Sequence, residues 1–372
     1  MGVRVHGDRG EEPDDGADTD GKGEPGGPGR QRDQQGEQRD ERCSSDDGRH
    51  EGDLHDPPVV DPLWIRSLNA GRHVRGLPLG HLAPTGFALA PELVRPRECD
   101  EFGMTSVRDL QSKCGEEPIT MLTAYDAVTA ELADAAGVDV LLVGDSMGNA
   151  VLGYDSTLPV TVDEVAARTG AVARGAEEAL VVADMPFLSF GHDLAESVAN
   201  AGRMLKEEGA NAVKIESGSH TIELTERLTE MGVPVVAHVG LTPQSVNQTG
   251  YVQQGHDPDE AREIFDLAVA HEEAGAFACV LEHIPANLAA QITAETEIPT
   301  IGIGAGPDCD GQVLVYTDAV GLSDWTPPFA ESFGDARSAM AEAMAAFVAA
   351  VEDGEFPSEE HSHVADELDD VY

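Results

Sequence analysis

Five ionisable side chains stand at the ends of apolar runs and could act together in proton transfer beside a metal ion. Asp145 ends VDVLLVGD, Asp184 ends ALVVAD, and Glu282 ends FACVLE. Lys214 and Glu216 end AVKIE two residues apart, so their side chains point to the same face of a strand. Three carboxylates suit a cation, a spare carboxylate can accept a proton, and an ammonium can stabilise negative charge. This set favours chemistry on a metal-held keto acid that loses a proton next to its carbonyl.

The elements that must position these residues are strands alternating with amphipathic helices. Val/Ile/Leu-rich runs without polar alternation are typical of parallel strands buried on both faces. Eight of them in about 250 residues predict a (β/α)8 barrel, which gathers the carboxyl ends of all its strands on one face. A doubly wound open sheet is the alternative, and it would gather the acidic residues less neatly. The predicted strands span residues 119–124, 138–145, 179–186, 212–217, 233–240, 277–283, 299–306 and 311–322.

Composition divides the chain into three parts. Residues 1–103 are rich in Gly, Pro, Asp and Gln and lack apolar periodicity, which predicts a disordered extension. Residues 104–363 carry the periodic pattern of the catalytic barrel, and residues 364–372 form an acidic tail. The extension is rich in arginine and almost free of lysine, and Met104 opens the first predicted helix. Translation starting at Met104 is therefore one hypothesis, and a genuine disordered extension is the other.

The charge is extreme for an enzyme-sized domain. Residues 104–372 contain 10 Lys+Arg and 48 Asp+Glu, a formal charge of −38, and the whole chain has only four lysines. Such a domain repels itself in dilute salt, whereas molar salt shortens the Debye length to about 3 Å and screens the repulsion. Acid excess with scarce lysine therefore indicates a halophilic cytosol, with an ordinary acidic protein as the alternative.

Several classes of protein are disfavoured. The absence of a basic patch argues against nucleic acid or an anionic membrane as a partner. No apolar run reaches the length of a membrane span, and no secretory signal is visible, so we expect a cytoplasmic protein. The five cysteines have neither the spacing of a metal site nor that of a disulfide framework.

Each motif also has an interpretation without chemistry. GDSMG, with Asp145 and Ser146, could be a plain turn, and Lys214 with Glu216 could be a buried structural ion pair. His238 could contact a substrate or could be a core histidine with satisfied nitrogens. GIGAG (302–306) lacks the order of a dinucleotide motif, which favours a tight loop facing a substrate.

Longer segments resemble one family, that of ketopantoate hydroxymethyltransferase. They include YDSTLPVTV, VVADMPF, NAVKIE, HVGLTPQSVN, VLEHIPANLA and IPTIGIGAG, and the resemblance covers about residues 104–363. It implies a barrel of the phosphoenolpyruvate mutase/isocitrate lyase superfamily, assembled as a homodecamer of two pentameric rings. It also implies transfer of a hydroxymethyl group from 5,10-methylenetetrahydrofolate to 3-methyl-2-oxobutanoate through a Mg-stabilised enolate. The product is ketopantoate, a precursor of pantothenate and coenzyme A.

The resemblance also assigns roles to individual residues. Asp145, Asp184 and Glu216 match the acids that hold one Mg²⁺ per subunit. Asp145 and Ser146, together with Asp184 and Lys214, match the residues that bind the keto acid, and Glu282 matches the proton acceptor.

Two departures from the family pattern stand out. The run that follows GLTPQSVN has Val252 near the place of a family lysine, and residues 1–103 have no family counterpart. A carbon–carbon lyase would use the same barrel and acids. It would normally also carry a cysteine-bearing active-site loop, which is not seen after the fourth or fifth predicted strand. A non-catalytic scaffold would be expected to lose some of the site residues, and this chain keeps all of them.

Overall fold

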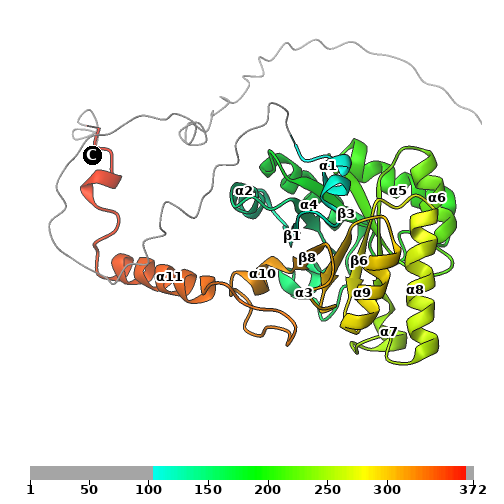
Figure 1. The fold of residues 1–372 in the computed structure, drawn as a ribbon. Helices are drawn as coiled ribbons and strands as arrows, with labels where there is room; N and C mark the ends of the chain where they lie inside the picture. The colour runs from blue at the N-terminus through cyan, green and yellow to red at the C-terminus, as the bar shows by residue number, and fades with distance from the viewer. Residues whose placement is uncertain (1–103, 366–372) are drawn as a thin grey trace, which may run out of the picture. The chain divides into compact units, whose positions relative to one another are not determined.

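The computed structural model describes residues 104–365. The predictions for residues 1–103 and for most of the acidic tail lie outside this range. Eight parallel strands close into a barrel, because β1 pairs with β8 as well as with β2, and helices surround the strands (Figure 1). The predicted (β/α)8 barrel is confirmed, and the open doubly wound sheet is wrong.

The strands follow one another round the barrel in chain order. They are β1 (Ile119–Thr123), β2 (Val140–Val143), β3 (Leu180–Asp184), β4 (Ala212–Glu216), β5 (Val235–Gly240), β6 (Ala278–Glu282), β7 (Thr300–Ile303) and β8 (Gly311–Leu314). The longer helices are α1 (Val107–Lys113), α2 (Ala127–Ala135), α4 (Val162–Gly175), α5 (Leu194–Lys206), α6 (Ile222–Glu230), α8 (Pro258–Glu273), α9 (Ala286–Glu295) and α11 (Ala336–Glu352). Short helical turns are α3 (Met147–Ala150), η2 (Pro243–Ser245), α7 (Val246–Thr249), α10 (Tyr316–Ala319) and η3 (Glu359–His361).

Alternate residues of the strands face the inside of the barrel. Val182, Val236 and Val280 belong to one apolar cluster, while their neighbours along the strands pack outward against the helices. Because side chains alternate along a strand, residues two positions further on face inward as well. The inward-facing residues are therefore apolar along most of each strand and polar at its carboxyl end. The candidate site lies where these polar side chains meet.

The opposite end of the barrel is closed by α1. Ser106 begins this helix with a capping box, in which Ser106 and Asp109 bond each other's backbone N–H groups. Leu110 of α1 is buried in the same cluster as Ile119 and Val140, which stand at the amino ends of their strands. Apolar packing thus fills this end and leaves the polar end free for chemistry.

Two predicted elements differ most from the observed ones. The last strand ends at Leu314 rather than at residue 322, because the N–H of Tyr316 donates to Thr123 Oγ1 at 2.9 Å and α10 begins there. The Ala-rich run over residues 330–352 predicts a terminal helix. The observed helix begins only at Ala336, and Asp335 caps it through the N–H of Ser338. None of the helices within residues 104–365 is long and apolar enough to cross a membrane.

Candidate active site

Strand register brings the predicted site residues together at the carboxyl end of the barrel. Along β3 to β6, inward positions that begin as valine or alanine end in charged or polar side chains. Because neighbouring strands are parallel and in register, these side chains become direct neighbours across the sheet. The paired residues are Asp184 with Lys214, Glu216 with His238, and Gly240 with Glu282.

Asp184 and Lys214 form a buried ion pair. Lys214 Nζ lies 2.8 Å from Asp184 Oδ1, and the side chains are 5% and 4% exposed. The other carboxylate oxygen of Asp184 accepts a hydrogen bond from the Asp145 N–H at 2.9 Å. The ion pair of the VKIE motif thus joins Lys214 to a neighbouring strand rather than to Glu216, and it also anchors the GDSMG turn.

Gln244 ties the remaining acids together. Its side-chain amide donates to Asp145 Oδ2 at 2.9 Å and to the Met185 carbonyl at 2.9 Å. Its backbone N–H donates to Glu216 Oε2 at 2.9 Å. Gln244 is buried in the turn after β5, so the loop that begins GLTPQ is part of the site. Gln244 is not among the site residues predicted from the sequence.

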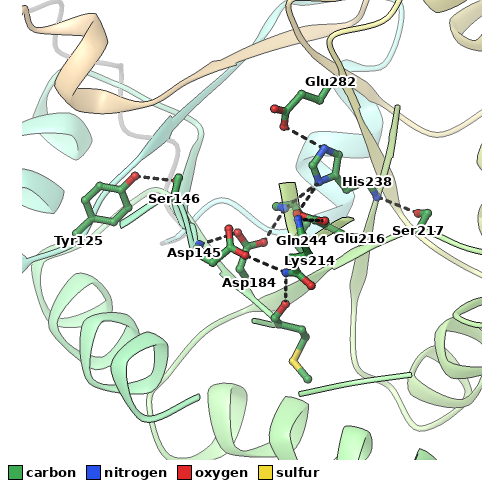
Figure 2. A network of polar contacts seen from close by, with 11 residues as sticks. Tyr125, Asp145, Ser146, Asp184, Lys214, Glu216, Ser217, His238, Gln244 and Glu282 are labelled. Carbon is green, nitrogen blue, oxygen red and sulfur yellow. Dashed lines mark hydrogen bonds and ion pairs between the residues drawn. The ribbon is translucent and has the colours of Figure 1, made fainter. Parts of the chain in front are cut away.

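Glu282 lies apart from the other acids and is the most accessible of them, with 18% of its side chain exposed. His238 Nε2 lies 3.1 Å from Glu282 Oε2, and His238 Nδ1 lies 3.2 Å from Lys214 Nζ. Since an ammonium can only donate, Nδ1 accepts and Nε2 carries the hydrogen. This hydrogen is on the Glu282 side of the ring but is not aligned for a hydrogen bond to the carboxylate. Figure 2 shows His238 between Glu282 and the Lys214 cluster. His238 therefore belongs to the site rather than being an isolated core histidine.

Gly240 allows the end of β5 to approach the backbone of Glu282 closely. Gly240 has φ +96°, and a Cβ on it would run into the carbonyl oxygen of Glu282. The next residue, Leu241, donates its N–H to that carbonyl at 2.8 Å. Only glycine combines this backbone conformation with so close an approach. Gly240 therefore fixes the end of β6 against β5.

Ser146 faces the same space from the opposite side of the site. Its hydroxyl is 2.8 Å from the hydroxyl of Tyr125, which is fully buried beside it. Burial raises the pKa of Tyr125, so the phenol stays protonated. Tyr125 was not singled out from the sequence, because nothing in TMLTAYDAV distinguishes it from a core aromatic residue.

The acids repel one another. Burial and then the charge of Asp184 raise the pKa of Asp145 to about 7. Burial and then the charge of Asp145 raise the pKa of Glu216 well above its ordinary value. Burial lowers the pKa of Lys214, but the three surrounding carboxylates outweigh it and raise that pKa. Burial and the positive charge of Lys214 lower the pKa of His238, which keeps the imidazole neutral.

A divalent cation fits the excess of negative charge. Three buried carboxylates surround a single ammonium, and oxygen ligands of this kind suit Mg²⁺. Asp184 Oδ1 lies 2.8 Å from Lys214 Nζ but accepts no hydrogen bond from any residue that the structure describes. As the side chains stand, no three His, Cys, Asp or Glu residues within 104–365 converge as metal ligands. The donor set thus suits the ion in charge and chemistry, and Asp145, Asp184 and Glu216 would have to converge to hold it.

We expect the raised pKa of Asp145 to make the metal-free protein less stable as pH rises. Between its ordinary value of 3.8 and about 7, the folded state holds a proton that the unfolded chain has released. Mg²⁺ must displace that proton, so its affinity should rise over the same interval. Chemical denaturation in EDTA across this interval, compared with Asp145→Asn, isolates the effect. A wild-type stability that rises relative to Asp145→Asn would contradict the assignment.

A cavity of about 1100 Å³ opens beside this cluster. Ser146 and Glu282 line it, together with Tyr251, His283 and residues of the segment after β8. Ile303 of the GIGAG motif, predicted to form a loop that faces a substrate, also lines the cavity. None of the cavity-lining residues within 104–365 is a cysteine.

Comparison with known proteins agrees with this geometry. The family model for ketopantoate hydroxymethyltransferase matches residues 104–359. The chain belongs to the ketopantoate hydroxymethyltransferase family. The match begins at the first residue that the structure describes and takes in every strand of the barrel.

Curated relatives of the family are close in sequence. The 3-methyl-2-oxobutanoate hydroxymethyltransferase of Haloarcula marismortui is 71% identical over 269 residues, covering 72% of this chain and 100% of the relative. The protein of that name from Natronomonas pharaonis is 63% identical, covering 71% of this chain and 99% of the relative. The one from Halobacterium salinarum is 66% identical, covering 69% and 94%.

Solved structures with a similar arrangement include two enzymes of low sequence identity. Phosphonopyruvate hydrolase, in complex with oxalate and Mg²⁺, matches 69% of this chain and 93% of its own, with a TM-score of 0.46 and 15% identity. The 2,3-dimethylmalate lyase, a member of the phosphoenolpyruvate mutase/isocitrate lyase superfamily, matches 71% and 93%, with a TM-score of 0.44 and 16% identity.

We expect this acidic protein to be most stable in concentrated salt. Relatives from halophilic archaea are consistent with the salt-adapted composition read from the sequence. We expect the melting temperature to rise as KCl increases from roughly 0.1 to 3 M, because self-repulsion is screened. Thermal melts monitored by circular dichroism measure this. A melting temperature that does not respond to KCl would contradict the halophilic interpretation.

Proposed function

We propose that the chain transfers a hydroxymethyl group from 5,10-methylenetetrahydrofolate to 3-methyl-2-oxobutanoate, giving 2-dehydropantoate. Membership of the family and the names of its close relatives support the reaction and the keto acid. The observation that carries the proposal is the interlocked cluster of Asp145, Asp184, Lys214 and Glu216, with Glu282 standing apart beside a cavity. The folate donor and the roles below are parts of the proposal.

The keto acid would bind between the cluster and Ser146. A divalent cation held by Asp145, Asp184 and Glu216 would polarise the keto carbonyl and make the neighbouring C3 proton more acidic. The hydroxyl of Ser146, held by Tyr125, can donate to the substrate carboxylate. The ammonium of Lys214 stays charged through its carboxylate neighbours and can stabilise an oxygen that gains negative charge.

Glu282 would accept the C3 proton. It is accessible from the cavity, whereas the other carboxylates are buried. His238 Nε2 lies 3.1 Å from its carboxylate and would orient it by donating its N–H once the two groups align. The carbon that loses the proton then attacks the methylene carbon of the donor, forming a carbon–carbon bond. One carbon–nitrogen bond of the donor opens in this attack, and water displaces the second nitrogen from the same carbon. The hydroxyl oxygen therefore comes from water, and tetrahydrofolate leaves with the C3 proton and one proton of the water.

The test follows product formation and proton exchange separately. Purified protein in molar KCl and Mg²⁺ receives 3-methyl-2-oxobutanoate and 5,10-methylenetetrahydrofolate, and 2-dehydropantoate is measured by mass spectrometry. In D₂O without donor, loss of the C3 proton signal is followed by NMR. Product formation with both substrates supports the proposal. Absence of both reactions refutes it, and cleavage of a keto acid without donor would favour the lyase alternative.

We also propose that residues 104–363 are the catalytic part. The described strands and all the proposed site residues lie inside this range. A chain that begins at Met104 should therefore turn over like the full chain, with kcat changed by less than about two-fold, well inside the ten-fold that 1.4 kcal/mol would produce. Parallel assays of both forms measure this, and a large loss on truncation would overturn it. Intact mass of the native protein tests whether residues 1–103 are translated.

Assembly and location complete the proposal. We propose a homodecamer of two pentameric rings in the cytoplasm, as the family resemblance implies. Native mass spectrometry or analytical ultracentrifugation in molar salt measures the number of subunits. A stable monomer or dimer with full activity would refute the decamer.

A further inference from the structure

The cavity beside the cluster is large for a small keto acid. Its volume of about 1100 Å³ lies just above the range of about 300–1,000 Å³ that is typical of pockets for drug-sized ligands. Two of its lining residues, Ser146 and Glu282, belong to the proposed keto-acid site. Its remaining wall includes His283, Tyr251 and Phe329, whose flat side chains the proposed chemistry has not used.

His283 has a strained backbone directly after the proposed base. Its φ is +48°, a conformation that side-chain-bearing residues rarely adopt. Two hydrogen bonds hold it there: its N–H donates to the Ile303 carbonyl at 2.8 Å, and its carbonyl accepts from the Gln254 N–H at 3.1 Å. Strain of this kind concentrates at sites that bind ligands. The fold therefore fixes the imidazole of His283 at one place on the cavity wall.

The two ring nitrogens of His283 have different surroundings. Nδ1 is buried and has no hydrogen-bond partner. Nε2 is not among the buried atoms without a partner, and it makes no hydrogen bond to any described residue. A buried N–H without an acceptor is costly, which favours the tautomer with the hydrogen on Nε2. His283 thus presents a free N–H donor on a half-buried ring that lines the cavity.

Phe329 packs against this imidazole. The ring centroids are 5.1 Å apart with planes inclined at 44°. Gly304 leaves room for the pair, because a Cβ there would lie 3.0 Å from Phe329 Cγ and 3.3 Å from His283 Nδ1. The GIGAG loop thus makes space for an aromatic wall rather than for a phosphate.

We propose that this wall binds the flat heteroaromatic ring of the one-carbon donor, with His283 Nε2–H donating to a ring carbonyl or ring nitrogen. Phe329 contacts the face of the ring. Asp155, Asp318 and Asp324 also line the cavity, and their carboxylates can accept hydrogen bonds from the amino and N–H groups of a reduced pterin. The inference rests on the proposed function and adds a donor-specificity residue adjacent to Glu282.

The test separates donor binding from keto-acid chemistry. His283→Gly removes the imidazole and suits the positive φ, so the variant should fold. Phe329→Leu removes the aromatic face. The matched controls are Phe333→Leu, on the same segment but 75% exposed, and His192→Ala on the barrel surface. Neither control residue lines the cavity.

Three quantities decide the outcome for each variant. They are KM for 5,10-methylenetetrahydrofolate, affinity for tetrahydrofolate by calorimetry, and the rate of C3 proton exchange without donor. We expect KM for the donor to rise about five- to ten-fold in His283→Gly, the scale of one lost hydrogen bond. Tetrahydrofolate affinity should fall in parallel, and proton exchange should stay within about two-fold, far from a ten-fold loss.

Each contrary result has a distinct meaning. An unchanged KM for the donor in both His283→Gly and Phe329→Leu would overturn the proposal that this wall binds the donor ring. A parallel loss of proton exchange overturns it as well, because His283 then acts on the keto acid. If wild-type protein neither exchanges the C3 proton nor forms product with both substrates, the proposed function itself fails and this inference fails with it.

Discussion

Glu282→Gln is expected to abolish exchange of the C3 proton of 3-methyl-2-oxobutanoate while the protein still binds the keto acid and Mg²⁺. Glutamine keeps the size of the side chain and its contact with His238, but its amide cannot accept the proton. Turnover should fall by about 10²- to 10⁴-fold, the contribution of a positioned general base. Exchange in D₂O without donor, followed by NMR, measures this step alone.

The matched control for this variant is Glu226→Gln, which makes the same change at an exposed position of α6. It should exchange at the wild-type rate. Calorimetric titration with keto acid and Mg²⁺ shows whether binding survives in Glu282→Gln. Exchange at the wild-type rate in Glu282→Gln would remove Glu282 from the mechanism.

Asp184→Ala should abolish both Mg²⁺ binding and turnover. The substitution removes one proposed ligand, the acceptor of the Asp145 N–H and the nearest partner of Lys214. Breaking a buried ion pair on one side costs about 3–5 kcal/mol, because the other charge stays buried. We expect the lower end of that range, since Asp145 and Glu216 remain near the ammonium.

Metal titration and chemical denaturation in molar KCl measure the two effects separately. Asp163→Ala is the matched control, because Asp163 pairs with Arg203 at 2.6 Å but is 85% exposed. Exposed pairs contribute little to stability, so this variant should resemble wild type. The double variant Asp184→Ala with Lys214→Met should recover stability but not activity. Near-normal activity of Asp184→Ala in Mg²⁺ would show that the site is wrongly assigned.

The fold could be predicted from the sequence because its strands are buried on both faces. Runs such as ALVVAD carry no polar alternation, which separates them clearly from the amphipathic helices between them. The end of β8 could not be predicted in this way. GQVLV continues into apolar residues, and the turn depends on a hydrogen bond from Tyr316 to Thr123, nearly two hundred residues earlier. Tertiary contacts of this length leave no local pattern.

The site was predictable where charge interrupts an apolar strand. Asp184, Lys214 and Glu282 stand out because an ionisable side chain at the end of a buried run is costly without a purpose. Gln244 and Tyr125 do not stand out, because a polar loop residue and a core aromatic residue are ordinary in those places. Their roles come from contacts with distant residues, which register and loop geometry decide.

The hydrogen bonds of Gln244 have a consequence for the kinetics. They fix the turn after β5 to Asp145, Glu216 and the carbonyl of Met185, so this turn cannot swing aside as an entrance. The keto acid must then reach the cluster through the cavity on the Glu282 side, where we propose that the donor ring binds. A donor that arrives first would block the keto acid. We therefore expect compulsory-order addition, with the keto acid entering before the donor and tetrahydrofolate departing before the product.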